Sequence, residues 1–386
     1  MKNKALIISI IFLLLAPVMP MTAEDPHPLN VIQTVVPFLT IAPDSRAGAM
    51  GDAGVATSPD LYSMHWNPAK YAFIDGNGGL GISYSPWLRS LVPDINLAYL
   101  TGYYRIDSKQ VLASSLMYSS LGEIQFTDDY GNYQNNFNPN EFSVDVAYSR
   151  LFSQHWSGGV ALRFIYSNIT GGTYVGSTET KAGTAFAADA SAYYTTALKL
   201  GSKTGNISAG ANFSNIGSKM SYTSDKDPDF IPMNMRLGST FSVSLDRYNT
   251  LAISVDINKL LVPTPPVYQD GVIVKGMDPN VSVPVAIFQS FYDAPYGFGE
   301  EMHEFMESIG IEYWYNQQFA LRAGYFNSAE CKGNMKYFTA GAGFRLSVFT
   351  LDFSYLIPIT QNNPLSNTLR FSLGFEFDSL RNVSKK

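Results

Sequence analysis

Charged residues, histidine and cysteine are all scarce in this 386-residue chain. Charged side chains make up 15% of it, there are four histidines, and Cys331 is the single cysteine. One cysteine excludes an internal disulfide framework, and four scattered histidines do not form a metal-binding pattern. The formal net charge of −6 gives no basic field for nucleic acid. Because no nucleophile–base pair can be identified either, we predict that the chain is not an enzyme and binds no cofactor.

Long hydrophobic runs are missing beyond the N-terminus. Lys2 and Lys4 precede an apolar run from Ala5 to Ala16, which is typical of a secretory signal peptide and too short for a spanning helix. After it, no stretch approaches the roughly 18 apolar residues of a transmembrane helix. Aromatic residues nevertheless reach 14%, with 24 Tyr and 25 Phe. An exported, aromatic and weakly charged chain of this kind predicts an all-β protein, a transmembrane antiparallel barrel in the outer membrane of a Gram-negative cell.

Alternation of apolar and polar side chains supports a barrel of about 14 strands. It is clearest in TLAISVDINK (250–259), FTLDFSYLI (349–357) and LRFSLGFEFD (369–378), as expected for strands with one face in lipid and the other in the lumen. Other candidate strands lie at 79–87, 95–104, 110–119, 142–149, 160–167, 184–194, 206–215, 235–246, 305–315, 319–326 and 338–346. Short and long links alternate, which predicts short periplasmic turns, long outer loops and both termini in the periplasm. A soluble β-sandwich is the alternative, with shorter strands.

A small-residue segment, RAGAMGDAGVATSPDLYSMHWNPAKYAF (46–73), precedes the first strand. Small residues allow close backbone packing, and Asn-Pro favours a fixed turn. The segment resembles the N-terminal hatch of barrels related to the FadL fatty acid transporters, which folds inside the lumen. The positions that carry this resemblance are Met50, Gly51, Gly54, Asp60, Asn67, Pro68 and Ala69. We therefore predict a signal peptide (1–23), a hatch (24–77), a barrel (78–379) and a C-terminal tail (380–386).

Within that superfamily, the stretch LTIAPDSRAGAMGDAGVATSPD, the strand count and the long loop after Asn258 resemble the PorV family of the type IX secretion system. The resemblance implies that the barrel binds secreted cargo by its C-terminal sorting domain at the outer-membrane translocon. It also implies transfer of cargo to a sortase-like cysteine peptidase for surface attachment. One departure is the ending SLRNVSKK, which lacks the terminal aromatic residue often used in barrel assembly.

Two further groups of residues are candidates for function. The alternation points a nearly balanced set of charges into the lumen, where we expect them to pair because unpaired buried charge is costly: Asp145, Arg163, Arg236, Asp256, Glu312, Arg322, Arg345, Asp352, Arg370 and Glu376. Alternatively, these charges do not pair, and each is solvated separately in a water-filled lumen. The long, apolar loop 260–302 is a candidate for partner binding, through Pro263, Pro265, Pro266, Phe288, Phe291, Tyr292 and Tyr296. The alternative for this loop is that it folds over the mouth of its own barrel. The alternative functions of the protein are a FadL-type channel for hydrophobic small molecules and a structural barrel without transport.

Overall fold

Fourteen antiparallel strands close into one barrel in the computed structural model, which describes residues 28–88, 94–127, 130–175, 178–223, 228–359 and 363–377. The order of the strands around the ring follows the chain, and β1 pairs with β20 to close it. The predicted signal peptide and the tail 380–386 lie outside the described residues. The barrel strands are β1 (Gly78–Pro86), β2 (Ile95–Arg105), β3 (Gln110–Leu121), β6 (Asn140–Leu151), β7 (Trp156–Asn168), β10 (Gly183–Leu200), β11 (Lys203–Gly217), β12 (Asn234–Ser244), β13 (Asn249–Leu260), β16 (Met306–Tyr315), β17 (Phe319–Asn327), β18 (Lys336–Leu346), β19 (Phe349–Pro358) and β20 (Leu369–Glu376).

The two faces of the barrel wall differ as the alternation predicts, most clearly on strands such as β3 and β6. On β3, Val111 and Met117 are buried inside the ring, whereas Leu112, Leu116 and Tyr118 are exposed on its outer face. Successive side chains of a strand point to opposite faces, so one apolar set meets lipid while the other fills the interior. Among the described residues, no helix is long and apolar enough to cross a membrane.

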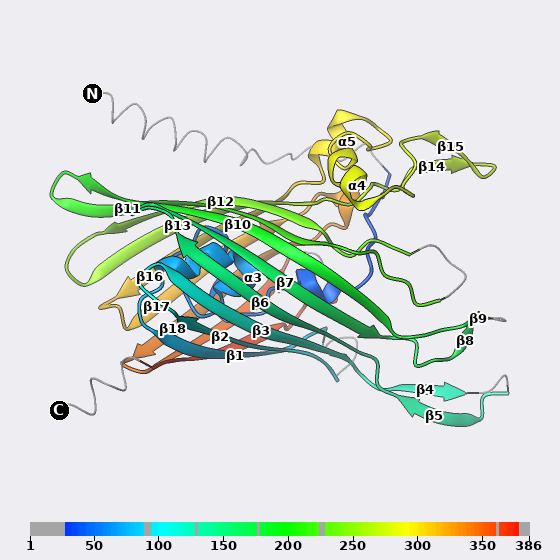
Figure 1. Cartoon of the computed structure of the whole chain (residues 1–386), viewed down its shortest axis with the longest axis horizontal. Helices are drawn as coiled ribbons and strands as arrows, with labels where there is room; N and C mark the ends of the chain where they lie inside the picture. Colours follow the sequence, from blue (N-terminus) through cyan, green and yellow to red (C-terminus); the bar gives the residue numbers. More distant parts are fainter. Residues whose placement is uncertain are drawn as a thin grey trace.

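The two ends of the barrel differ in the length of their connections (Figure 1). Six short links at residues 106–109, 152–155, 201–202, 245–248, 316–318 and 347–348 form what we name the turn end. The opposite loop end carries the long connections, as the link lengths predict. These include the hairpins β4 (Ile124–Thr127) with β5 (Tyr133–Phe137) and β8 (Tyr174–Val175) with β9 (Thr178–Glu179).

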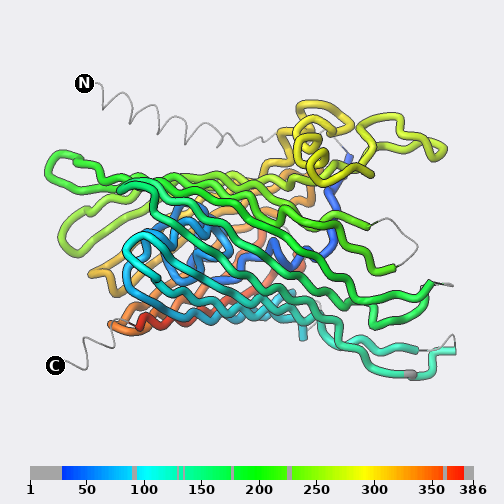
Figure 2. Tube along the Cα trace, viewed as in Figure 1, coloured from blue at the N-terminus to red at the C-terminus, as the bar shows by residue number. Residues whose placement is uncertain are grey.

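Residues 37–74, named here the lumen segment, lie inside the ring, where Figure 2 shows them in blue. They form only short helices: η1 (Pro37–Thr40), α2 (Ser45–Gly48), α3 (Ser63–Trp66) and η2 (Pro68–Phe73). Helix η2 packs against β6 and β7, and α2 packs against β18, β19 and β20. Small side chains make this close packing possible, because Ala49, Ala53, Ala56 and Ala69 are completely buried.

The first and last described residues lie at opposite ends of the barrel. The Asn30 backbone N–H donates to the Cys331 carbonyl (2.8 Å) in a long connection, whereas the Phe377 N–H donates to the Gly78 carbonyl (3.0 Å) at the turn end. The described part of the chain therefore starts and ends on opposite sides of the barrel, whereas the termini that the prediction placed in the periplasm lie outside the described residues. An even number of strands returns the chain to the side where β1 starts, but the lumen segment crosses the barrel once more before β1.

A folded cap covers part of the loop end. We name residues 261–305 the loop-end cap; it contains the hairpin β14 (Val267–Gln269) with β15 (Val272–Lys275), then α4 (Val283–Gln289) and α5 (Phe298–Met302). Next to it lies η3 (Glu330–Lys332), in the connection between β17 and β18. The Asn30 side-chain amide donates to Glu300 (2.8 Å) and to the Pro265 carbonyl (3.1 Å), so the start of the described chain is attached to the cap.

Candidate functional sites: the lumen segment and the loop-end cap

Two glycines of the predicted hatch motif hold the middle of the lumen segment against the barrel wall. The backbone N–H groups of Gly54 and Val55 both donate to one carboxylate oxygen of Asp256 on β13, at 2.7 and 2.9 Å. The Gly51 N–H donates to the Thr339 hydroxyl on β18 (2.8 Å). Gly51 has φ +63°, and a Cβ there would lie 2.5 Å from the Tyr325 carbonyl oxygen, so only glycine fits.

The Asn67-Pro68-Ala69 turn starts η2 and fixes it to the wall. The Asn67 side-chain oxygen accepts from the Ala69 N–H (3.1 Å), while its amide donates to the carbonyls of Val55 and Ala192, both at 2.9 Å. Pro68 occupies the first position of the helix, where its missing N–H costs no hydrogen bond. The Ala69 carbonyl accepts from the Ser157 hydroxyl of β7 (2.6 Å). This turn is therefore a fixed joint between the segment and the wall strands β7 and β10.

Met50, another residue of the motif, faces glycines of the wall. An added Cβ at Gly310 would lie 2.5 Å from the Met50 Cβ, and one at Gly324 would lie 2.1 Å from the Met50 carbonyl carbon. The wall is therefore glycine-lined where the lumen segment approaches it most closely. Larger residues at these two wall positions would displace the segment.

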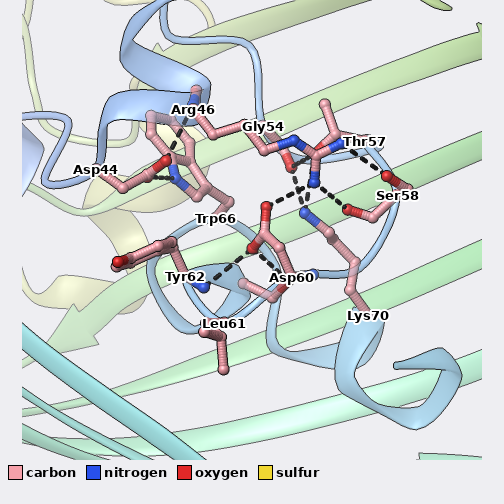
Figure 3. A network of polar contacts seen from close by, with 12 residues as sticks. Asp44, Arg46, Gly54, Thr57, Ser58, Asp60, Leu61, Tyr62, Trp66 and Lys70 are labelled. Carbon is pink, nitrogen blue, oxygen red and sulfur yellow. Dashed lines mark hydrogen bonds and ion pairs between the residues drawn. The ribbon is translucent and has the colours of Figure 1, made fainter. Parts of the chain in front are cut away.

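A chain of ion pairs joins the lumen segment to three strands of the wall. Arg46 pairs with Asp60 of its own segment (2.8 Å) and with Glu312 of β16 (2.7 Å), and Figure 3 shows Arg46 and Asp60 side by side. Glu312 also accepts from Arg322 of β17 (2.7 Å), which in turn donates to Asp352 of β19 (2.7 Å). All five side chains are largely buried. Such a chain is costly to break at any one member, because the remaining charges would stay buried.

A second group of inward charges lies on the strands β6, β7 and β10. Arg163 pairs with Asp145 (2.5 Å) and with Asp189 (3.2 Å), and it also donates to the Asn215 side-chain oxygen. The other predicted lumen arginines are not in ion pairs among the described residues: Arg236 stacks on Trp66 (4.5 Å to the ring centre), Arg345 on Trp314 (5.1 Å), and Arg370 lies near Trp87 (5.7 Å). Arg345 and Glu376 line a cavity of about 170 Å³ near the turn end, which Asp352 also borders.

The sequence candidates left out several ionisable residues of the lumen segment, among them Arg46, Asp44 and Lys70. Arg46 carries the ion-pair chain, and the Asp44 carboxylate accepts from the Trp66 indole (2.6 Å). Lys70 is completely buried, and its ammonium donates to the Gly54 carbonyl and to the Thr57 hydroxyl, both at 2.9 Å (Figure 3). The signal available in the sequence was the presence of charges inside a small-residue segment that was itself predicted to be enclosed.

The loop-end cap holds a cluster of buried opposite charges. Lys259, at the end of β13, pairs with Glu301 (2.9 Å) and Glu304 (2.5 Å). Lys332 of η3 pairs with Glu300 (2.7 Å) and also with Glu304 (2.9 Å). Glu304 thus bridges two lysines from different parts of the chain. The cap is fixed to the barrel by charge as well as by apolar packing.

Two groups of this cluster have displaced pKa values. Burial opposes the charged form of Lys332, but the carboxylates of Glu304 and Glu300 outweigh it and raise its pKa. Burial raises the pKa of Asp293 to about 6, and the nearby charges of Glu304 and Glu301 add to that rise. The Thr264 N–H donates to the Asp293 carboxylate (3.1 Å) and acts in the opposite direction.

The predicted partner-binding residues of this loop fall into two groups. Pro263 and Pro266 are buried, Pro265 is half-buried, and Tyr296 lies half-buried beneath Lys275, so these four do not form an open contact surface. In contrast, three aromatic side chains point outward from α4 and the following residues: Phe288 is 71% exposed, Phe291 40% and Tyr292 64%. Phe298, which the sequence analysis did not select, is 79% exposed. We name Phe288, Phe291, Tyr292 and Phe298 the aromatic surface of the cap.

A closed antiparallel barrel with an apolar outer face and a charged, filled interior defines an outer-membrane β-barrel. The family model described as "Type IX secretion system protein PorV" matches residues 24–267, more than half of the chain. The chain therefore belongs to the PorV family of the type IX secretion system, which is not an enzyme family. No curated protein matches it.

Solved structures of similar fold share little sequence with this chain. The toluene transporter TodX of Pseudomonas putida is 9% identical, with a TM-score of 0.49 over 90% of this chain and 99% of that one. A FadL homologue of Pseudomonas aeruginosa is 10% identical, with a TM-score of 0.43 over 90% and 100%. The toluene transporter TbuX of Ralstonia pickettii is 9% identical, with a TM-score of 0.42 over 86% and 96%.

Proposed function

We propose that this barrel binds secreted cargo carrying a C-terminal sorting domain at the type IX translocon and delivers it to the sortase-like cysteine peptidase complex. Membership of the PorV family supports the pathway. The observation that supports direct binding of cargo is the aromatic surface of the cap, because exposed aromatic side chains on a rigid support are typical of protein interfaces.

The loop end would face the cell exterior, as long loops do in bacterial barrels, and the C-terminus would lie in the periplasm. The lumen segment would act as a hatch. It is held to the wall by backbone hydrogen bonds and by the ion pairs from Arg46, which favours a plugged barrel over an open porin. We place the FadL-type channel second because large exposed aromatic side chains lie on the loop-end cap, whereas the inner face of the barrel carries many buried charges.

The test removes three of the four side chains of the aromatic surface without changing the buried charges beneath them. A variant with Phe288→Ser, Tyr292→Ser and Phe298→Ser should fold and insert normally, since these side chains are exposed. A buried interface aromatic contributes on the order of 2 kcal/mol, so losing three should abolish a micromolar contact. Cargo with a sorting domain should then accumulate in the periplasm or leave the cell unattached.

The matched control changes exposed tyrosines of other loop-end hairpins, Tyr133→Ser and Tyr174→Ser. Secretion should stay normal in this control. Normal secretion in the triple variant, together with reduced uptake of a hydrophobic compound, would instead support the channel. Normal secretion and normal uptake would show that the aromatic surface has neither role.

A further inference from the structure

The outer wall of the barrel is hollowed over β1, β2, β3 and β6, on the half nearer the turn end. The register places Leu80, Gly102, Ser114 and Val146 side by side across these strands, all on the outer face. The two central members of this row have almost no side chain. Larger residues stand in the adjacent rows of the same face: Leu100 and Leu116 in one, Tyr104 and Leu112 in the other.

The result is a cavity of about 970 Å³ in the membrane-facing wall, lined mostly by apolar side chains. Gly102 is needed for its depth, since a Cβ there would lie 2.7 Å from the Leu80 side chain. Leu80, Leu100, Leu112 and Val146 around the cavity are all strongly exposed in the isolated barrel. The whole outer face is apolar, but this region differs from the rest of it in being hollowed.

Two basic side chains lie at the turn-end side of the hollow: Lys109 and Arg150 are exposed in the adjoining turn and strand end. Arg105 also lines the cavity, but its guanidinium donates to the carbonyls of Gly76 (3.0 Å) and Ile74. Arg150 lies on the outer face four residues along β6 from Val146, a separation of about 13 Å. Asp107 is the one acid of this turn, and it already accepts from the Lys109 N–H (2.7 Å) and the Gln110 amide (2.5 Å).

An apolar hollow in a membrane wall, with cationic groups beside it at the end of the strands, has the layout of an anionic amphiphile. Lys109 lies in the turn between β2 and β3, and Arg150 is the second-last residue of β6, so both lie where the strands leave the hydrocarbon core, near the level of lipid headgroups. We propose that this hollow is a specific binding site for a phospholipid with an anionic headgroup. Its acyl chains occupy the space over Gly102 and Ser114, and its phosphate lies between Lys109 and Arg150. This site is independent of cargo binding at the loop end.

The experiment uses the full barrel, purified in detergent and freed of lipid. Phosphatidylglycerol or phosphatidylcholine with identical acyl chains is added, and bound lipid is measured by native mass spectrometry. We expect at least tenfold tighter binding of phosphatidylglycerol. Ser114→Leu fills the floor of the hollow and should weaken that binding at least tenfold. The control, Ala323→Leu, adds the same side chain on the outer face of β17 and should not change it.

The headgroup contact has its own variants. The double change Lys109→Gln and Arg150→Gln should reduce phosphatidylglycerol binding to the level of phosphatidylcholine. Arg247→Gln, in the exposed turn between β12 and β13, should have no effect. Equal binding of both lipids to the unchanged barrel, or unchanged binding in Ser114→Leu, would overturn the proposal.

A second readout distinguishes lipid from a protein neighbour. A photoreactive residue in place of Val146 should form a lipid adduct when native membranes are irradiated. A protein adduct at this position, with no lipid adduct, would show that a partner side chain fills the hollow and would also overturn the proposal.

Discussion

Asp256 offers the sharpest test of how the lumen segment is held. Its carboxylate accepts two backbone N–H groups, from Gly54 and Val55, and it is buried in the barrel wall. Hydrogen bonds to a charged group contribute about 1.5 kcal/mol each at the low end. Replacing Asp256 by Ala should thus weaken attachment of the segment by about 3 kcal/mol. Since about 1.4 kcal/mol is a factor of ten, the segment should open on the order of 100-fold more often.

The opening can be followed by thiol labelling in detergent. Ser63→Cys introduces a nearly isosteric reporter at a completely buried position of the lumen segment. The reaction of this introduced thiol with a maleimide should be on the order of 100-fold faster in the Asp256→Ala background, with Asp256→Asn between the two because it keeps one acceptor oxygen. Buried Cys331, in the connection between β17 and β18, serves as the internal control and should not change.

Two results would refute this reasoning. A labelling rate for the introduced thiol within about twofold of the rate in the Asp256 parent would mean that this carboxylate does not hold the segment. Equal acceleration at Cys331 would mean that the barrel as a whole has been destabilised, and the effect could not be assigned to the lumen segment.

Three further changes test the outer face, the cap and its pH dependence. Phe353→Arg, mid-strand on the lipid face of β19, should cost about 2–4 kcal/mol of barrel stability in urea unfolding, and Phe349→Arg at the turn end about 0–1; equal costs would contradict the membrane placement. Lys259→Met leaves two carboxylates buried and should destabilise the cap by about 3–5 kcal/mol in limited proteolysis, whereas Lys336→Met, from an exposed pair, should cost less than about 1. Because the folded pKa of Asp293 is about 6, above an unfolded value of about 3.9, its contribution is complete below about pH 4 and is lost as the pH rises through 6. Protease resistance of the cap should therefore fall from about pH 5 to about pH 7 in the parent more than in Asp293→Asn, and identical profiles would remove Asp293 as the cause.

The strands could be predicted from the sequence because lipid and lumen impose opposite demands on neighbouring residues. Phe353 and Ser354 are an example: the first is exposed on the outer face and the second completely buried inside. Exposed and buried side chains therefore alternate with a period of two along the strands, and this alternation can be recognised in the sequence. The same alternation predicts that Asp145, Arg163, Glu312 and similar charged side chains point to the interior. It does not predict which of them form ion pairs with one another.

The partners of those charges could not be predicted, because they depend on contacts between distant parts of the chain. Arg46 lies 266 residues from Glu312, yet the two form a short pair. The fold of the cap depends on such contacts too. Pro263 and Pro266, predicted to bind a partner, are buried, and the lysine–glutamate cluster holds their loop as a folded unit. Periodicity carries no information about such tertiary contacts.

The lumen segment also touches the place where the ring closes. The Tyr62 hydroxyl lies 3.0 Å from the Ile82 carbonyl on β1 and 3.1 Å from the Leu373 carbonyl on β20, and the Ser45 N–H donates to the Ser372 hydroxyl (2.8 Å). The first and last strands thus meet over a segment that contacts both. A ring sealed before this segment was in position would have to be threaded afterwards by a free chain end, drawing Arg46 and Lys70 past a packed wall. Assembly in the order segment first and seam last avoids that passage, and makes the N-terminal segment a template on which the cylinder is completed.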